Sequence, residues 1–223
     1  MDGPRLIVVG AGGQGAEIQA YAEDLLAEGR IREFLGFLDD DPTRASSVKH
    51  LIGGLTALTN CRDEFFRDVS YLTAIGDNPT RQRIVGTLER LYGERLRPWT
   101  LVHPMSYVGQ AVEIGTGTCL APSAIVTCRT RIGRHSILNV KVSVSHDCVI
   151  GDFVNINPAA TVCGNVTIGS GAYIGAGATI KDKIKIGAGA IIGAGAVVVD
   201  DMPPNVTAVG VPARIIKQPA VVA

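Results

Sequence analysis

A six-residue repeat of aliphatic side chains is the feature that most restricts the fold of this chain. From residue 102 to residue 198, every sixth residue is Ile, Leu or Val, and the spacing never slips. An α-helix has a period of about 3.6 residues and a flat strand a period of about 2, so neither keeps every sixth residue in the same environment over such a length. A three-sided coil with six residues on each side does. The repeat therefore predicts a parallel β-helix, a three-sided prism whose coils stack about 4.7 Å apart. The seventeen aliphatic positions are Val102, Val108, Ile114, Leu120, Val126, Ile132, Leu138, Val144, Ile150, Ile156, Val162, Ile168, Ile174, Ile180, Ile186, Ile192 and Val198.

The distribution of glycine supports this interpretation. The chain has 27 Gly, where average usage of about 7% gives about 16. Eight of them directly follow a repeat position, where the chain turns a corner and a side chain would often be in the way. We expect the aliphatic positions and these glycines to build the prism and to take no part in chemistry. The eight are Gly109, Gly115, Gly133, Gly151, Gly169, Gly175, Gly187 and Gly193.

The residues before the repeat have the alternating pattern of a small α/β domain. We expect a Rossmann-like half-domain over residues 1–99, the β-helix over residues 100–217 and a flexible tail over residues 218–223. Between the second and third strands, Ile52 to Leu55 is expected to be a turn before a weak helix. The expected strands are Leu6–Val9, Phe34–Leu38 and Tyr71–Ile75, and the expected helices are Ala16 to about Glu28 and Thr80 to about Tyr92.

A glycine-rich turn joins the first strand to the first helix. Gly10, Gly12 and Gly15 fit the spacing G-x-G-x-x-G, and Asp39 follows at the end of the second strand. In this order of elements, backbone N–H groups of the turn meet a phosphate, and the carboxylate meets a ribose or a base. A complete dinucleotide fold needs two such halves, for which the domain is too short, so we expect a single nucleotide here. A tight turn with only a structural role is the alternative.

Charge, hydropathy and cysteine usage exclude several classes. The chain carries 21 Lys plus Arg and 21 Asp plus Glu, so it lacks the basic excess that binds nucleic acid. The longest uncharged apolar stretch, Ile186 to Val199, contains four glycines and is shorter than the roughly 18 residues of a membrane span. The start lacks the pattern of a secretory signal, and the five cysteines form no CxxC pair. We therefore expect a cytoplasmic protein with free thiols.

Three of the four histidines are expected to be structural. His50 is isolated in a polar segment, and His103 lies at the domain junction. His135 is expected at a solvated corner of the prism. His135 and His146 are eleven residues apart, so they do not converge as zinc ligands, and no metal is expected.

His146 is the candidate general base, because Asp147 follows it directly. A neighbouring carboxylate can hold the tautomer of an imidazole and raise its basicity. Adjacent residues of an extended segment point in opposite directions, so a direct bond requires the corner between two sides of the coil. Gly164 lies one coil further on, where it leaves room for a thioester and an amide for an oxyanion. An exposed histidine without a catalytic role is the alternative.

An ordered set of motifs resembles a known family across nearly the whole chain. The family is that of the bacterial nucleotide-sugar N-acetyltransferases that acylate a 4-amino sugar, such as those of bacillosamine and perosamine biosynthesis. The resemblance implies a left-handed β-helix and a homotrimer with acetyl-CoA in the groove between neighbouring subunits. The motifs are Val9 to Gly15, Phe37 to Asp40, Ala74 to Asn78 with Arg81, Val102 to Pro104, Ser145 to Asp152 and Val209 to Arg214.

The resemblance also implies roles for single residues. His146 would be the general base and Asp147 its acidic partner. Some relatives have a second histidine nine residues after the base, where this chain has Asn155, which can still orient a sugar or bridge a water. The implied substrate-binding residues are Gly12, Gly13, Gln14, Asp39, Asp40, Asp77, Asn78 and Asn155. The implied acetyl-CoA contacts are Gly164, Ala176, Ala194 and Arg214, with Lys181 or Lys183 adding positive charge.

The activity that the resemblance implies is transfer of an acetyl group from acetyl-CoA to the 4-amino group of a nucleotide-linked sugar, for polysaccharide biosynthesis. Two alternatives stay open. An O-acetyltransferase on the same fold would acylate a hydroxyl, and a non-catalytic scaffold would bind the nucleotide sugar alone. The sequence does not distinguish UDP, GDP and dTDP, because a carboxylate at a strand end can accept hydrogen bonds from several bases.

Overall fold

The computed structural model describes residues 3–46 and 48–218. The chain divides into two compact units, Met1–Thr100 and Leu101–Ala223, and each is described by itself. Apart from Gln218, the tail expected over residues 218–223 lies outside the described residues. Among the helices of the described ranges, none has the length and apolar character needed to span a bilayer.

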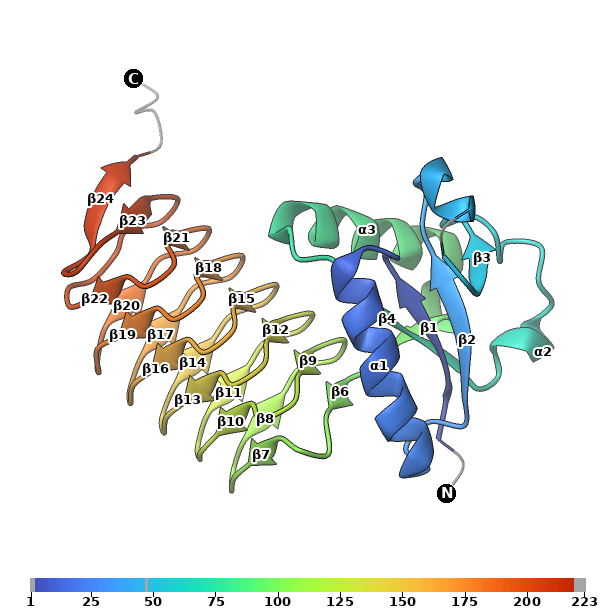
Figure 1. The fold of residues 1–223 in the computed structure, drawn as a ribbon, viewed down its shortest axis with the longest axis horizontal. Helices are drawn as coiled ribbons and strands as arrows, with labels where there is room; N and C mark the ends of the chain where they lie inside the picture. The colour runs from blue at the N-terminus through green and yellow to red at the C-terminus, as the bar shows by residue number, and fades with distance from the viewer. Residues whose placement is uncertain (1–2, 47, 219–223) are drawn as a thin grey trace. The chain divides into compact units, whose positions relative to one another are not determined.

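The N-terminal unit is a five-stranded parallel sheet with its helices and turns (Figure 1). The strand order is β3-β2-β1-β4-β5, so the first strand lies at the centre. This central strand is buried and aliphatic from Leu6 to Val9, as a parallel strand covered on both faces must be. The elements are β1 (Arg5–Val9), α1 (Gly13–Ala27), β2 (Glu33–Leu38), the 3₁₀ turn η1 (Pro42–Ser46), β3 (Leu51–Gly53), α2 (Asp63–Phe66), β4 (Val69–Thr73), α3 (Asn78–Tyr92), η2 (Gly93–Arg95) and β5 (Arg97–Pro98).

The structure differs from the sequence-based expectation at three places in this unit. The segment expected to be only a turn contains a short edge strand, β3, which pairs in parallel with β2. The first helix begins at Gly13, inside the glycine-rich turn, so the turn supplies the first N–H groups of the helix. The third expected strand ends at Thr73, and Ala74 and Ile75 continue as irregular chain toward α3.

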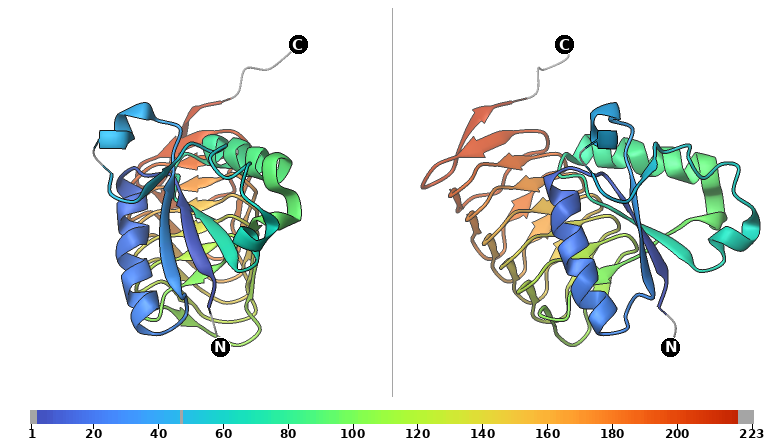
Figure 2. Two further views of the ribbon diagram at one scale, coloured as in Figure 1. Left: turned by 90° about the vertical axis from the view of Figure 1, so that its right-hand side faces the viewer. Right: turned by 45° about the vertical axis from the view of Figure 1, so that its right-hand side comes forward.

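The C-terminal unit is a left-handed parallel β-helix. Figure 1 labels the strands of its three stacks, and the right-hand view of Figure 2 shows the same coils from another angle. Each strand pairs in parallel with the strand one coil later, as Ser143 does with Thr161. Two sides are the stacks β7-β10-β13-β16-β19-β22 and β8-β11-β14-β17-β20, and the third runs from β6 to β21 and ends with β23 and the antiparallel β24. The strands are β6 (Leu101–Val102), β7 (Tyr107–Val108), β8 (Glu113–Ile114), β9 (Cys119–Leu120), β10 (Ile125–Val126), β11 (Arg131–Ile132), β12 (Ile137–Leu138), β13 (Ser143–Val144), β14 (Val149–Ile150), β15 (Asn155–Ile156), β16 (Thr161–Val162), β17 (Thr167–Ile168), β18 (Tyr173–Ile174), β19 (Thr179–Ile180), β20 (Lys185–Ile186), β21 (Ile191–Ile192), β22 (Val197–Val198), β23 (Thr207–Val209) and β24 (Arg214–Lys217).

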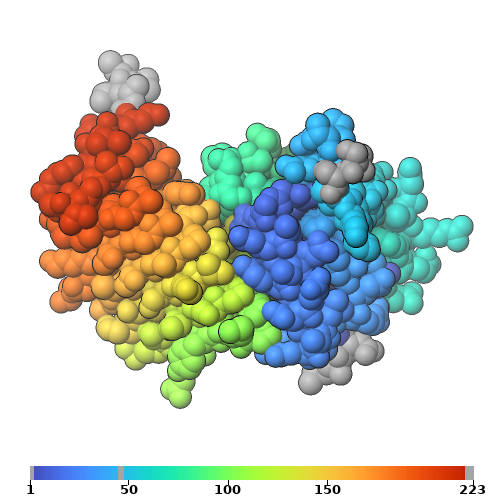
Figure 3. Space-filling view, viewed as in Figure 1, coloured from blue at the N-terminus to red at the C-terminus, as the bar shows by residue number. Residues whose placement is uncertain are grey.

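The six-residue repeat fills the interior of this prism. From Leu120 onward, every repeat position is at most 2% exposed. The earlier Val108 and Ile114 are partly buried against the same core. In the space-filling view the coils form successive layers in chain order (Figure 3). Gly115 shows why glycine follows a repeat position, because a Cβ there would lie 2.5 Å from the backbone nitrogen of Arg134 in the next coil.

The expectation for His135 was wrong in one respect. His135 lies at a corner of the prism, with a φ of 52°, but its side chain is 1% exposed rather than solvated. Phe153 occupies the same corner one coil later and stacks on the imidazole, with ring centroids 5.2 Å apart and planes 13° apart. This stacking keeps His135 inside the packed corner.

Candidate active site

His146 and Asp147 lie at the corner between β13 and β14, and their side chains are in contact. Nδ1 of His146 and Oδ2 of Asp147 are 2.6 Å apart. Asp147 has a φ of 59°, which turns its side chain back toward the preceding residue, as a direct bond between neighbours requires. The side chain of His146 is 51% exposed. The ring is therefore oriented on one edge by Asp147 and is accessible from solvent.

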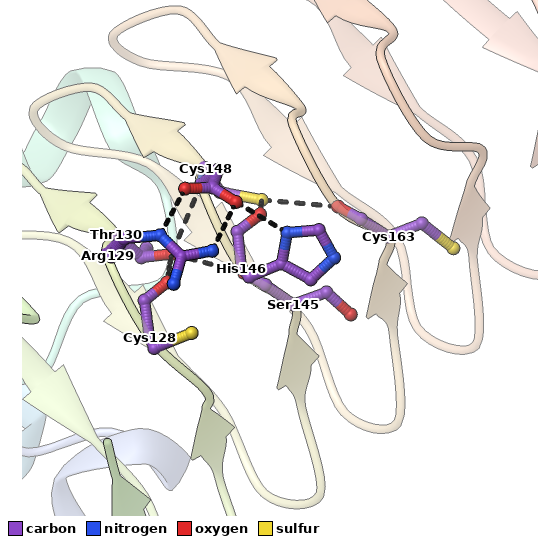
Figure 4. Close-up of polar contacts among 8 residues, drawn as sticks. Cys128, Arg129, Thr130, Ser145, His146, Cys148 and Cys163 are labelled. Atoms are coloured by element: carbon purple, nitrogen blue, oxygen red, sulfur yellow. Dashed lines mark hydrogen bonds and ion pairs between the residues drawn. The ribbon is translucent and has the colours of Figure 1, made fainter. Parts of the chain in front are cut away.

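Arg129, from the preceding coil, is a third member of this cluster (Figure 4). Its Nε donates to Oδ1 of Asp147 at 2.7 Å, and its second terminal nitrogen donates to Oδ2 at 2.9 Å. Hydrogen bonds from Arg129, and then from His146, hold the pKa of Asp147 well below the usual range. The same carboxylate raises the pKa of Arg129. Because an ionised Asp147 can only accept, the neutral tautomer of His146 that fits this contact has the proton on Nδ1 and the lone pair on Nε2.

Gly164 lies against the face of the His146 ring. A Cβ at this position would be 2.7 Å from Cε1 and 2.8 Å from Nε2 of the imidazole, so only glycine fits without displacing the ring. The Gly164 carbonyl accepts from the N–H of Lys183, and the Asn165 N–H donates to the His146 carbonyl. Within residues 3–46 and 48–218, no group accepts a hydrogen bond from the N–H of Gly164.

Three cysteines surround the dyad of His146 and Asp147, as Figure 4 shows. Cys128 and Cys163 are partly buried, and Cys148 is buried. The Cys148 thiol donates to the carbonyl of Cys163 at 3.2 Å, and burial raises its pKa. All three are free thiols.

In the part of the chain that the structure describes, no three His, Cys, Asp or Glu side chains are grouped closely enough to bind a metal ion.

In the N-terminal unit, Asp39 and Asp40 lie at the carboxyl end of β2 beside the glycine-rich turn. Oδ2 of Asp39 accepts the N–H of Ala11 at 2.7 Å, and Oδ1 accepts the N–H of Asp41 at 2.9 Å. Oδ1 of Asp40 accepts the N–H of Leu55 at 2.7 Å. Both carboxylates therefore fix the loops around the edge of the sheet.

A cavity of about 210 Å³ opens at this edge. Gly10, Asp39, Asp40, Ile75 and Thr80 are among the residues that line it. It lies at the carboxyl ends of β1 and β2, beside Ile75 and the first turns of α3, the place at which parallel α/β sheets bind ligands. The first N–H groups of α1, at Gly13 and Gln14, have no partner within the helix.

Asp77 and Asn78 begin α3 at the same edge. Asp77 is the N-cap residue, and its carboxylate accepts the N–H of Thr80 at 2.9 Å. Hydrogen bonds from Thr80 lower the pKa of Asp77. Asn78 accepts from Arg81 at 2.8 Å, and Arg81 also donates to the carbonyl of Ile75. Burial lowers the pKa of Arg81 to about 10.

Both units match known proteins. Residues 5–88 match the family model described as the PglD N-terminal domain, and residues 147–182 and 165–200 match the bacterial transferase hexapeptide model of six repeats. The acetyltransferase domain of PglB from Neisseria gonorrhoeae FA1090, solved in complex with acetyl coenzyme A, is 30% identical, with a TM-score of 0.83, over 96% of this chain and 100% of that one. The chain belongs to the PglD-type hexapeptide-repeat acetyltransferases.

Two further relatives are informative for this PglD-type chain. PerB from Caulobacter crescentus, solved with CoA and GDP-perosamine, is 30% identical, with a TM-score of 0.83, over 96% of this chain and 97% of that one. A GDP-perosamine N-acetyltransferase from Escherichia coli O157:H7 is 36% identical over 153 residues. That match spans 66% of this chain and 64% of the length of the relative.

In this PglD-type prism, the expected acetyl-CoA residues do not all lie at one corner. His146 and Gly164 lie at the corner between the β7–β22 side and the β8–β20 side. Ala176 and Ala194 are exposed and stack at another corner. Ala176 lies between β18 and β19, and Ala194 lies between β21 and β22. A single copy of the chain therefore presents two separate rows of expected acetyl-CoA contacts.

The remaining expected residues lie elsewhere on the prism. Asn155 is in β15, on the third side, and is 3% exposed. Arg214 begins β24 and is exposed. Lys181 and Lys183 are exposed beside the coil of Gly164.

Arg129 was not predicted from the sequence. It lies one coil before Asp147, just as Gly164 lies one coil after His146. The Arg–Asp pair at this spacing was the available signal.

Proposed function

We propose that this protein is an acetyl-CoA-dependent N-acetyltransferase that acts on the 4-amino group of a nucleotide-linked amino sugar. The observation that carries the proposal is the exposed imidazole of His146, which Asp147 orients on one edge and Gly164 flanks on one face. A general base beside a free backbone N–H is the arrangement that acyl transfer needs. Relatives that match nearly the whole chain bear the names of acetyltransferases, which supports the same reaction.

The chemistry follows from the tautomer of His146. The neutral amine of the sugar attacks the carbonyl carbon of the thioester, and Nε2 of His146 takes the proton that the amine loses. The N–H of Gly164 donates to the oxyanion of the tetrahedral intermediate. The carbon–sulfur bond then breaks, the amide forms, and CoA leaves as a thiolate that takes up the proton from His146 or from water. The products are the N-acetylated sugar and CoA thiol.

For the donor, we place acetyl-CoA in a groove between neighbouring copies of a homotrimer. The two rows of expected contacts favour this arrangement, because they lie at different corners of one prism. The corner of His146 on one copy would hold the acetyl group, and Ala176 and Ala194 of the next copy would leave room for the pantetheine arm. Arg214 and Lys181 or Lys183 would supply positive charge to the phosphates.

For the acceptor, we place the nucleotide at the carboxyl edge of the N-terminal sheet. The N–H groups of Gly12, Gly13 and Gln14 would bind the phosphates at the start of α1. Asp39 and Asp40 each retain lone pairs beyond the hydrogen bonds that they make to the backbone, and these can accept from the ribose or the base. Asp77 and Asn78 complete the proposed set at this edge of the sheet. In the prism, Asn155 is proposed separately as a polar group that orients the sugar or bridges a water.

A screen of UDP-, GDP- and dTDP-linked 4-amino sugars with acetyl-CoA tests this proposal, with release of the CoA thiol as the readout. We expect thiol release with one nucleotide series. Calorimetry that detects nucleotide binding but no CoA binding, with no thiol release from any sugar, would contradict it and would favour a non-catalytic scaffold.

A further inference from the structure

The side chain of Arg129 contacts Asp147 and has no role in the proposed reaction as described above. It comes from the corner one coil before Asp147, and both residues have positive φ, 48° and 59°. The backbones of the two coils are also hydrogen-bonded at this corner, because the Asp147 N–H donates to the carbonyl of Cys128 at 3.1 Å. The register of the prism thus places a guanidinium directly beside the carboxylate that orients His146.

The two oxygens of Asp147 are both occupied, and one of them is shared. Oδ1 accepts from Nε of Arg129, while Oδ2 accepts from Arg129 at 2.9 Å and contacts Nδ1 of His146 at 2.6 Å. A bidentate guanidinium fixes both the position and the plane of a carboxylate, which a single bond from an imidazole does not. The Asp147 side chain is 33% exposed, so without Arg129 it would be free to rotate into solvent.

From this geometry we infer that Arg129 is a positioning residue, which holds Asp147 in the orientation that keeps Nε2 of His146 ready to accept a proton. The inference rests on the proposed function, because it gives a role to the imidazole as a base. Arg129 itself touches only Asp147 in this cluster and acts through it.

Arg129 also limits the charge that His146 experiences. A lone carboxylate at 2.6 Å would strongly favour the imidazolium, which cannot act as a base. The positive guanidinium compensates that charge, so the pair presents little net charge to the ring. The other titratable groups near the dyad are the thiols of Cys128, Cys148 and Cys163, of which Cys148 is held neutral by burial. Two pairs of opposite charge also lie near this corner: Glu113 with Arg131, in the same surface hollow as Arg129 and Asp147, and Asp182 beside Lys183, one coil beyond Gly164. Arg129 is the charged group that bonds directly to Asp147.

The chain contains a matched control in a second ion pair, which lies on the neighbouring side of the prism and about one coil earlier. Arg131 and Glu113 are also one coil apart, and Nε of Arg131 donates to the Glu113 carboxylate at 2.9 Å. Both side chains are about as exposed as Arg129, at 68% and 70%. This ion pair does not contact His146, so its loss should not affect the dyad.

The test compares R129M, R129K and R131M in the full-length protein. Steady-state assays of thiol release give kcat, KM and their pH dependence, and NMR gives the pH at which the ring signals of His146 shift. We expect R129M to lower kcat about tenfold and to move both the acid limb of kcat/KM and the His146 signals toward higher pH, because the Asp147 carboxylate then acts on the ring without its counter-charge. R129K retains the charge but not the two-pronged geometry, so it should lower kcat and leave the pH dependence close to that of the wild type. R131M should change neither.

Each outcome decides the matter. If R129M has the same kcat and the same His146 titration as R131M, Arg129 has no positioning role. If R129M raises KM alone, Arg129 binds a substrate instead. The NMR titration needs no turnover, so it tests the coupling of Arg129 to His146 even if none of the sugars is acetylated and the proposed function itself fails.

Discussion

In the prism the side chains with a proposed chemical role point away from the core, whereas in the N-terminal unit they hold the loops on which they lie. His146 is half-exposed, and the interior beneath it consists of repeat aliphatics. Asp39 and Asp40, in contrast, each bind backbone N–H groups of neighbouring loops. Replacement of His146 should therefore leave the packing of the prism interior unchanged. The N-terminal unit cannot lose its carboxylates without changing its shape.

The largest effect is expected for His146→Ala. Loss of a general base typically lowers kcat by about 10²–10⁴-fold, and an exposed corner side chain contributes little to packing. Thiol release and the melting temperature should be measured on the same preparation, with the exposed His50→Ala variant as a control. A large loss of thermal stability in His146→Ala would show that the separation between chemistry and packing in the prism does not hold.

An intermediate effect is expected for Asp39→Ala, which should reduce both binding and stability. The Ala11 N–H in the glycine-rich turn and the Asp41 N–H lose their acceptor. Hydrogen bonds to charged groups are worth roughly 1.5–3 kcal/mol each, so nucleotide affinity should fall at least about tenfold and the melting temperature should fall as well. Calorimetry with nucleoside diphosphates and thermal unfolding measure the two effects.

The neighbouring Asp41→Ala is the matched control for Asp39→Ala. The Asp41 carboxylate binds the N–H and the hydroxyl of Thr43 within its own loop, so nucleotide affinity should stay close to that of the wild type. Equal affinities of all three proteins would contradict the role of Asp39 in shaping the turn.

The smallest effect is expected for Asp77→Ala at the start of α3. Loss of an N-cap of this kind costs about 1 kcal/mol of the free energy of unfolding. Because folding lowers the pKa of Asp77, its contribution is complete above the ordinary Asp pKa of about 3.9 and is lost as the pH falls through the lower native value. Denaturant unfolding between about pH 2 and 6 should therefore show that the variant and the wild type converge in acid. Asp182 is an exposed carboxylate of the prism, and Asp182→Ala is the control variant. If the free energies of unfolding of Asp77→Ala and the wild type differ by the same amount at all pH values, this role is contradicted.

The sequence predicted the prism well because its register repeats without a slip. A step of one 18-residue coil forward from His146 gives Gly164, and a step of one coil back from Asp147 gives Arg129. The same step would also have placed Phe153 over His135, which is why the expectation of a solvated His135 was wrong. Side chains at one corner are neighbours one coil apart, so contacts in the prism can be read from residue numbers.

The N-terminal unit was less predictable because its contacts have no repeat. β3 is a three-residue edge strand within Leu-Ile-Gly-Gly, a composition that is also typical of a turn. The bond from Ala11 to Asp39 joins residues 28 positions apart, and no spacing rule indicates it. Burial of Arg81 against the carbonyl of Ile75 is likewise a tertiary feature.

A matched pair of acceptors tests the central claim most directly. The pair is a nucleotide-linked 4-amino sugar and its 4-hydroxy counterpart, each incubated with acetyl-CoA and the wild-type protein, with CoA thiol and acetylated product measured together. We predict one thiol released for each N-acetylated sugar and no product from the hydroxy sugar. Equal acetylation of both sugars, or of the hydroxy sugar alone, would contradict the account.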